Sequence, residues 1–268
     1  MPNYRALGLL PPKRHIKLPR DREQSFKSEG LYYEHIVTTE GFDRAYSIMY
    51  HLRPPTRVRS VEHVGQVKLE AVEDMPLRHV HFRTADLPRH GDVVTGRMPF
   101  MFNQDVISYR CRPNESQAML YRNGAADEVI FIQSGGGVAE TMYGTLRYRR
   151  GDYLVIPRTT IYRLVPDDIQ QEDYMILEAT GAIRTPHRYN NADGQFLLGS
   201  PFYERDFHSP TELHVVDEDQ DTELLIKDGE RLTKVVLANH PLDVVGWDGF
   251  VYPYTFNAWD FEPLTGTV

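Results

Sequence analysis

The chain has 268 residues, of which 41% are hydrophobic and 25% are charged, and its formal net charge is −8. This composition is typical of a soluble globular protein, and the negative charge argues against nucleic acid as the main partner, because a phosphate backbone attracts a basic surface. The single cysteine, Cys111, excludes a disulfide within the chain and favours the cytoplasm. No apolar run approaches the about 20 residues of a membrane-spanning helix, and the N-terminus lacks the pattern of a signal peptide.

Proline and basic residues dominate the first part of the chain. Pro11, Pro12 and Pro19 lie among several Lys and Arg residues. Closely spaced prolines disfavour a helix, so the sequence predicts an extended arm over residues 1–30. The functional alternative is a basic, phosphate-binding arm, but an arm that lies over a neighbouring domain or subunit agrees better with the acidic chain.

Two segments after the arm are predicted to be strands. Residues 31–38 are rich in Tyr, Ile and Val, which favour strands. Residues 45–52 could form a strand or a short helix, and the alternation of Tyr46, Ile48 and Tyr50 with other residues favours the strand.

The histidine pair His79 and His81 is a weak candidate for metal binding. In a strand, both rings would lie on one face, because side chains repeat every second residue. Asp86 is the nearest carboxylate downstream. A metal site needs at least a third ligand, so a surface strand with two histidines is the favoured interpretation.

The stretch from residue 121 to residue 166 has the clearest organisation. Its short runs, residues 129–132, 138–142, 145–149 and 154–156, are separated by glycine turns and stopped by Pro157. Such runs without a helical period predict an antiparallel β-barrel or jelly roll.

The spacing within this stretch resembles the two sequence motifs of the cupin barrel. Six residues separate Glu128 from Gly135, and five separate Gly151 from Pro157. By this resemblance, metal-binding cupins supply two histidines and a carboxylate from the first motif and a third histidine from the second. The corresponding positions here hold Tyr121, Asn123, Glu128 and Tyr162. Because iron sites of this kind need imidazole nitrogens, we expect a metal-free barrel that is retained for its core and its partners.

The remaining chain predicts further strands and an aromatic end. Residues 174–179 form an apolar strand, and Asp228-Gly229 joins residues 223–227 and 232–238 in a predicted hairpin. Residues 239–268 are dense in aromatic side chains. We therefore expect an all-β, cupin-like jelly roll or β-sandwich with few short helices over residues 31–240. Residues 241–268 are expected to connect it to a C-terminal domain outside this chain.

Several segments together resemble the bacterial homogentisate 1,2-dioxygenase family. They are residues 121–124 with Asp127 and Glu128, residues 151–158, residues 200–207, and above all residues 243–249 with Tyr252-Pro253-Tyr254 and Phe256-Asn257. The resemblance covers the chain from about residue 31 onward. It implies a non-haem Fe(II) enzyme that opens the ring of homogentisate with O2, in an extradiol-type cleavage, during tyrosine and phenylalanine catabolism.

The resemblance also implies where the chemistry lies. In that family the N-terminal barrel is metal-free, the C-terminal barrel holds the iron, and the subunits assemble as trimers or hexamers. The family's iron ligands follow the segment that matches residues 246–261, so no catalytic residue or metal ligand is assigned here. We expect this chain alone to bind no Fe(II) and to be inactive. The alternative is a stand-alone, metal-free cupin that acts as a binding or assembly module.

These two hypotheses differ in what they predict for residues 239–268. An N-terminal part of a longer enzyme should expose an apolar surface there, where the other domain packs. A stand-alone module should bury the same aromatic side chains. A third, weaker hypothesis is an independent metal enzyme built on Glu128 or on His79 and His81, which would need stoichiometric metal.

Overall fold

The structure is a computed structural model that describes residues 3–13, 30–72, 76 and 78–262. The described chain consists of strands, short 3-10 turns and loops, and none of its described residues lies in an α-helix. The expectation of an all-β fold is therefore confirmed. None of the described segments is a helix that is long and apolar enough to cross a membrane.

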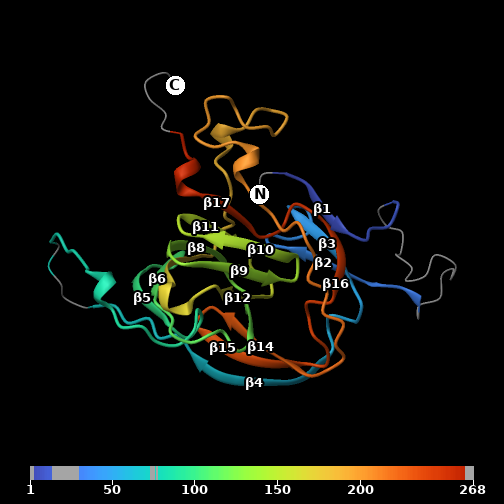
Figure 1. Ribbon diagram of the computed structural model, residues 1–268, viewed down its shortest axis with the longest axis horizontal. Helices are drawn as coiled ribbons and strands as arrows, with labels where there is room; N and C mark the ends of the chain where they lie inside the picture. Colours follow the sequence, from blue (N-terminus) through green and yellow to red (C-terminus); the bar gives the residue numbers. More distant parts are fainter. Residues whose placement is uncertain (1–2, 14–29, 73–75, 77, 263–268) are drawn as a thin grey trace.

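Two large sheets form the body of the molecule (Figure 1). The first has the order β10 (Gly144–Arg149), β9 (Gly136–Thr141), β12 (Tyr162–Pro166), β7 (Leu120–Asn123), β14 (Thr222–Asp228), β15 (Arg231–Leu237) and β4 (Val58–Gln66). The second has the order β17 (Tyr254–Asn257), β11 (Asp152–Ile156), β8 (Asp127–Ser134), β13 (Asp173–Ala179), β6 (Val106–Cys111) and β5 (Arg97–Phe102). Neighbouring strands are antiparallel except β14 and β7, which run parallel.

A smaller sheet lies beside this body, on the right in Figure 1. Its order is β1 (Arg5–Gly8), β16 (Val244–Gly249), β3 (Tyr46–His51) and β2 (Tyr33–Thr38). Five 3-10 turns complete the described elements: η2 (Thr84–Asp86), η3 (Ile169–Gln171), η4 (His187–Tyr189), η5 (Glu204–Asp206) and η6 (Ala258–Asp260). The loop that carries η4 and η5 rises above β17 at the top of Figure 1.

Apolar side chains from both large sheets meet between them, which makes this body a cupin-like β-sandwich. Ile130 and Ile176 come from the six-stranded sheet, and Leu146 and Leu164 come from the seven-stranded sheet, and all four belong to one buried cluster. A second buried cluster surrounds Trp247 and connects the small sheet with the body. Alternating residues of each strand supply these side chains, as period-2 geometry requires.

The glycine-punctuated stretch folds as its sequence predicts. Its four runs are β8, β9, β10 and β11, and they pair as antiparallel neighbours within the two sheets. Gly135 and Gly151 have φ values of 89° and 86° in the connections, a conformation that glycine adopts without steric cost. The hairpin around Asp228-Gly229 is also present as β14 and β15. Residues 46–51 form a strand and not a helix.

One expectation needs correction. The segment with His79 and His81 is not a strand, and both side chains are exposed. The spacing of the two histidines does not by itself make a strand, because a strand also needs a neighbour for its backbone hydrogen bonds, and this segment has none in the described sheets. In the predicted arm, Arg5–Gly8 is strand β1, which pairs with β16. Residues 14–29 of that arm lie outside the described part of the chain.

The aromatic C-terminal segment divides into two parts. Strands β16 and β17 are built into two sheets, and Trp247, Tyr252 and Tyr254 are buried. Trp259 and Phe261, which follow them, are 68% and 36% exposed. The buried aromatic residues of the first part agree with the hypothesis of a stand-alone module. The exposed Trp259 and Phe261 of the second part agree with the hypothesis of a longer enzyme. The division of the chain at residue 240 and a domain beyond it remain predictions.

Candidate functional site

The four positions of the cupin motifs converge inside the barrel. Glu128 lies on β8 and is fully buried. Tyr162 donates a hydrogen bond from its hydroxyl to Glu128 Oε2 at 2.6 Å, and the Tyr121 hydroxyl and Asn123 Nδ2 lie 3.4 and 3.3 Å from Oε1. The three partners come from β7 and β12, in the sheet that faces β8. The motif spacing therefore identifies residues that are neighbours in space.

Arg97 completes this arrangement, although no motif in the sequence pointed to it. Its guanidinium Nη1 forms an ion pair with Glu128 Oε1, and its Nη2 donates to the Tyr162 hydroxyl at 3.1 Å. Nε donates to the carbonyl oxygen of Val93 at 2.9 Å, and the guanidinium lies over the ring of Tyr121, 5.0 Å from its centre. Contacts with Tyr162, Val93 and Tyr121 therefore hold the Arg97 guanidinium beside the Glu128 carboxylate.

A second ion pair extends the cluster. Arg97 Nη1 also donates to Glu178 Oε1 at 2.9 Å, and Lys227 Nζ donates to Glu178 Oε2 at 2.5 Å. The Tyr109 hydroxyl donates to the same oxygen at 3.2 Å. The side chains of the four charged residues are at most 4% exposed. Two cations and two carboxylates balance, as a buried charge cluster requires.

The electrostatics of the cluster keep Glu128 ionised. Burial alone would raise the pKa of Glu128, but the charge of Arg97 and hydrogen bonds from Arg97, Tyr162 and Asn123 lower it below its ordinary value. Burial, followed by the charge of Glu128, raises the pKa of Tyr162 and of Tyr121 well above the ordinary value for tyrosine. The site therefore consists of a carboxylate, a guanidinium and neutral phenols at neutral pH.

This donor set does not fit Fe(II). A 2-His-1-carboxylate or three-histidine centre needs imidazole nitrogens with free lone pairs, and the motif positions hold two phenols and an amide. The carboxylate that remains is already bonded to a guanidinium, whose positive charge would repel a metal ion. Among the described residues there is also no group of three or more His, Cys, Asp or Glu side chains arranged to hold a metal. We therefore derive no metal chemistry from these positions.

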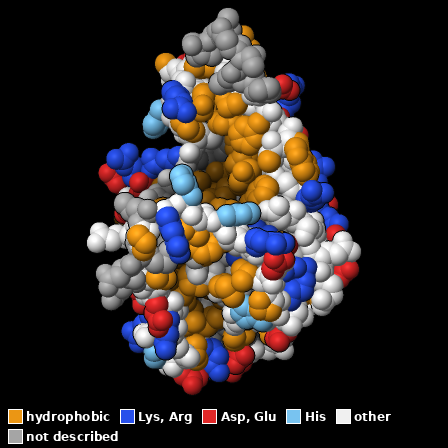
Figure 2. All heavy atoms as spheres, turned by 90° about the vertical axis from the view of Figure 1, so that its left-hand side faces the viewer, with side chains coloured by type: hydrophobic (Ala, Val, Ile, Leu, Met, Phe, Trp, Pro, Cys, Tyr) orange, Lys and Arg blue, Asp and Glu red, His pale blue; other side chains and the backbone are white. Residues whose placement is uncertain are grey.

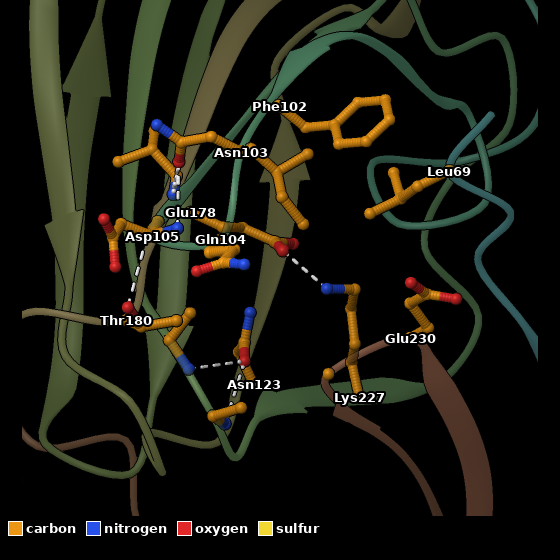
Figure 3. A pocket seen from close by; sticks show the side chains of 15 residues that line it. Leu69, Phe102, Asn103, Gln104, Asp105, Asn123, Glu178, Thr180, Lys227 and Glu230 are labelled. Atoms are coloured by element: carbon orange, nitrogen blue, oxygen red, sulfur yellow. Dashed lines mark hydrogen bonds and ion pairs between the residues drawn. The ribbon is translucent and has the colours of Figure 1, made fainter. Parts of the chain in front are cut away.

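A pocket of about 690 Å³ opens above the Glu178 end of the cluster. Figure 3 shows Lys227 reaching to Glu178 across its floor, with Phe102 and Leu69 on the opposite side. Asn123, one of the four residues at the cupin-motif positions, also lines the pocket. The sequence analysis missed Lys227, although a lysine directly after the apolar run Leu224–Ile226, within one strand, was a visible signal.

The histidine pair singled out by the sequence does not take part in this site. The loop that carries His79 and His81 exposes both rings, and no hydrogen bond or ion pair joins either of them to the cluster among the described interactions. Their role as metal ligands stays a prediction without support from the geometry.

A different pair of histidines is linked to a buried carboxylate. His51 Nδ1 lies 2.7 Å from Asp243 Oδ1, and His51 Nε2 lies 3.2 Å from His35 Nδ1. Asp243 is fully buried and also accepts the backbone N–H of Arg53 at 2.9 Å. Burial, with the nearby His51 and Arg122, lowers the pKa of His35 to about 4. The contacts of His35, His51 and Asp243 thus link β2 and β3 to the segment before β16.

The fold and the motif positions around Glu128 define an all-β protein of the cupin type. Comparison with protein families agrees with this and is more specific: a family model described as "Homogentisate 1,2-dioxygenase N-terminal" matches residues 93–258. The chain belongs to this family.

Curated relatives place the chain among larger proteins. It is similar to a Saccharolobus solfataricus protein, named provisionally as a dioxygenase, with 34% identity over 98% of this chain and 66% of the relative. It is 30% identical to the homogentisate 1,2-dioxygenase of Nitrobacter hamburgensis over 52% of this chain and 30% of that enzyme. It is 26% identical to a homogentisate 1,2-dioxygenase of Rhodopseudomonas palustris over 88% of this chain and 55% of that enzyme. The chain thus spans only part of each relative's length.

Solved structures show weaker similarity. A cupin 2 conserved barrel domain protein from Leptotrichia buccalis matches 60% of this chain and 88% of its own, with 10% identity and a TM-score of 0.26. The protein Ylba from E. coli matches 68% of this chain and 91% of its own, with 13% identity and a TM-score of 0.31.

Proposed function

We propose that this chain is the metal-free N-terminal part of a homogentisate 1,2-dioxygenase-like enzyme, which opens an aromatic ring with Fe(II) and O2. One observation carries the proposal. The position of the cupin carboxylate holds Glu128, whose two oxygens accept hydrogen bonds from Arg97, Tyr121 and Tyr162, so a metal ion at this position would have to displace these partners. In this proposal, the iron is held by residues outside the described barrel.

The exposed surface at the end of the described chain supports the same proposal. Phe261 packs against Phe202 and Phe256, and Trp259 lies beside Gly151, yet Trp259 and Leu198 remain 68% and 100% exposed. Figure 2 shows hydrophobic side chains gathered over the upper part of the molecule, where Figure 1 places η4, η5 and η6. Exposed apolar surface of this kind is typical of a contact with another domain or subunit.

The family similarity suggests the further details of the proposal. The complete enzyme would take homogentisate and O2, cleave the ring in an extradiol-type reaction, and serve tyrosine and phenylalanine catabolism in the cytoplasm. It would assemble as a homotrimer or a hexamer. In this assembly the barrel described here would act as a scaffold that carries the catalytic part.

Oxygen consumption tests the proposal when the chain is compared with a chimaera. The chimaera joins the chain to the part of the Saccharolobus protein that the alignment does not cover. Each sample receives Fe(II), ascorbate and homogentisate in an oxygen electrode, and bound iron is measured on the same sample. We expect uptake and about one iron per subunit for the chimaera only. Turnover by the chain alone, or iron without turnover in the chimaera, would contradict the proposal.

A second candidate function is a stand-alone, metal-free cupin that acts as a binding or assembly module. The burial of Trp247, Tyr252 and Tyr254 favours it, because these aromatic side chains pack within the described chain and need no further domain to cover them. In that case the chimaera would show neither iron nor oxygen uptake, while the chain alone would be a soluble, defined oligomer in light scattering.

A further inference from the structure

The pocket of about 690 Å³ has features of a binding site that the dioxygenase proposal does not use. Its walls are largely apolar and come from distant parts of the chain: Leu69 from the loop after β4, Phe102 from β5, Ile107 from β6 and Ala126 from the turn before β8. Its floor is the buried pair of Lys227 and Glu178. An apolar pocket with a few fixed polar groups is the usual form of a small-molecule site.

The floor presents N–H groups that have no acceptor among the described residues. An ammonium group has three donors, and among the described residues only Glu178 accepts from Lys227 Nζ. The Lys227 side chain is 4% exposed, so water has little access to the other two. Asn123 Nδ2 has one described acceptor, Glu128 Oε1 at 3.3 Å, and Figure 3 shows its amide nitrogen directed toward the same space.

The acceptors at the floor are already in use. Glu178 Oε1 accepts from Arg97, and Glu178 Oε2 accepts from both Lys227 and Tyr109. A ligand that offers only donors would therefore find no free acceptor on this carboxylate. A ligand oxygen with lone pairs matches the donors of Lys227 and Asn123.

The charges around the pocket select against an anion. The positive charge of Lys227 is balanced by Glu178 at 2.5 Å. Two further carboxylates, Asp105 and Glu230, line the pocket and add negative charge. A carboxylate or phosphate would be repelled by these groups at short range, whereas a neutral carbonyl oxygen accepts the same hydrogen bonds without that cost.

We propose that this pocket binds a neutral small molecule that has an apolar body and a carbonyl oxygen. The oxygen accepts from Lys227 Nζ, with Asn123 Nδ2 as the second donor, and the body packs against Phe102 and Leu69. The site does not depend on iron or on a further domain, so it is separate from the dioxygenase proposal and can be tested on this chain.

Three probes of similar shape separate the contributions. They are 4-hydroxyacetophenone, which has the carbonyl; 4-ethylphenol, which lacks it; and 4-hydroxyphenylacetate, which replaces it with a carboxylate. Their affinities for the full chain are measured by ligand-observed NMR titration. One hydrogen bond from a charged donor corresponds to about tenfold in affinity, so we expect the ketone to bind about tenfold more tightly than either of the others.

Two variants locate the binding, and a third is the matched control. Lys227→Met removes the donors and should abolish the preference for the ketone over 4-ethylphenol. Phe102→Ala removes an apolar wall on an edge strand and should weaken all three probes by about threefold to tenfold. Met101→Ala changes the neighbouring residue, which does not line the pocket and is 56% exposed, and should leave every affinity unchanged.

The outcomes are decisive even if Lys227→Met does not fold, because Phe102→Ala and Met101→Ala alter exposed side chains. A ketone preference in the unchanged chain, with affinities that fall in Phe102→Ala but not in Met101→Ala, supports the site. Equal affinity for the three probes, tighter binding of the carboxylate, absence of binding, or equal effects of Phe102→Ala and Met101→Ala would overturn it.

Discussion

The buried cluster makes Arg97 a residue whose loss should strongly destabilise the chain. Arg97→Met keeps the length and the apolar stem of the side chain but leaves Glu128 without its cation and removes one of the two cations beside Glu178. Both members of the Arg97–Glu128 pair are at most 4% exposed. Removal of one partner from such a pair costs about 3–5 kcal/mol, because the remaining charge is buried without compensation.

Urea unfolding measures this cost. The intrinsic fluorescence of the fully buried Trp247 reports the transition. With a denaturant slope of about 3 kcal/mol per M, the midpoint should fall by about 1–2 M. The matched control is Arg147→Met, since Arg147 pairs with Asp167 on the surface, where the two side chains are 66% and 54% exposed. Loss of an exposed pair of this kind costs about 1 kcal/mol or less.

A double-mutant cycle assigns the effect to the ion pair. Glu128→Gln removes the negative charge and retains a polar side chain, so the combination with Arg97→Met no longer buries that unpaired carboxylate. The double variant should be more stable than the sum of the single losses predicts, by about 1–3 kcal/mol. Strict additivity, or a loss in Arg97→Met no larger than that in Arg147→Met, would refute this reasoning.

Three further predictions concern other parts of the molecule. Because the pKa of His35 is lowered to about 4 in the folded chain, the unfolded chain takes up that proton at a higher pH than the folded chain does. The free energy of unfolding should therefore fall as the pH decreases from about 6.5 to 4, by at most about 3 kcal/mol. Unfolding at several pH values should show that this pH-dependent part is lost in His35→Gln and retained in the exposed control His63→Gln. Gly144→Ala should cost about 1–3 kcal/mol more than Gly194→Ala in thermal unfolding, because both residues have positive φ but a Cβ at Gly144 meets a backbone carbonyl; equal losses would contradict this. Burial raises the pKa of Cys111 to about 12, so an aromatic disulfide reagent should react with the thiol only after unfolding; rapid reaction of the native chain would be inconsistent with it.

The sequence predicts the barrel strands because their signals are local. Residues 121–166 contain the runs, the glycine turns and the stop at Pro157 within one short stretch, and these determine β8 to β11 without reference to the rest of the chain. The motif spacing also brings Tyr121, Asn123 and Tyr162 to Glu128, because each position is fixed by the strand on which it lies.

The partners that decide the chemistry of the site could not be predicted in this way. Arg97, Glu178 and Lys227 come from β5, β13 and β14, and their pairing depends on contacts between strands that are far apart in the sequence. Charged residues in a sequence are usually read as surface positions, so no local pattern predicted the burial of Arg97 and Glu178, and only Lys227 carried a signal, because it directly follows an apolar run. The opposite error arose at His79 and His81, which were expected on a surface strand, whereas this segment pairs with none of the described strands.

Binding of Fe(II) to the purified chain tests the central claim most directly, namely that the ion-pair network around Glu128 takes the place of a metal centre in this barrel. The chain is titrated anaerobically with Fe(II) in a calorimeter, and iron is measured by elemental analysis after gel filtration. We predict no saturable heat and no retained iron, for the chain and for Glu128→Gln alike. One tightly retained iron per chain that is lost in Glu128→Gln would contradict the claim.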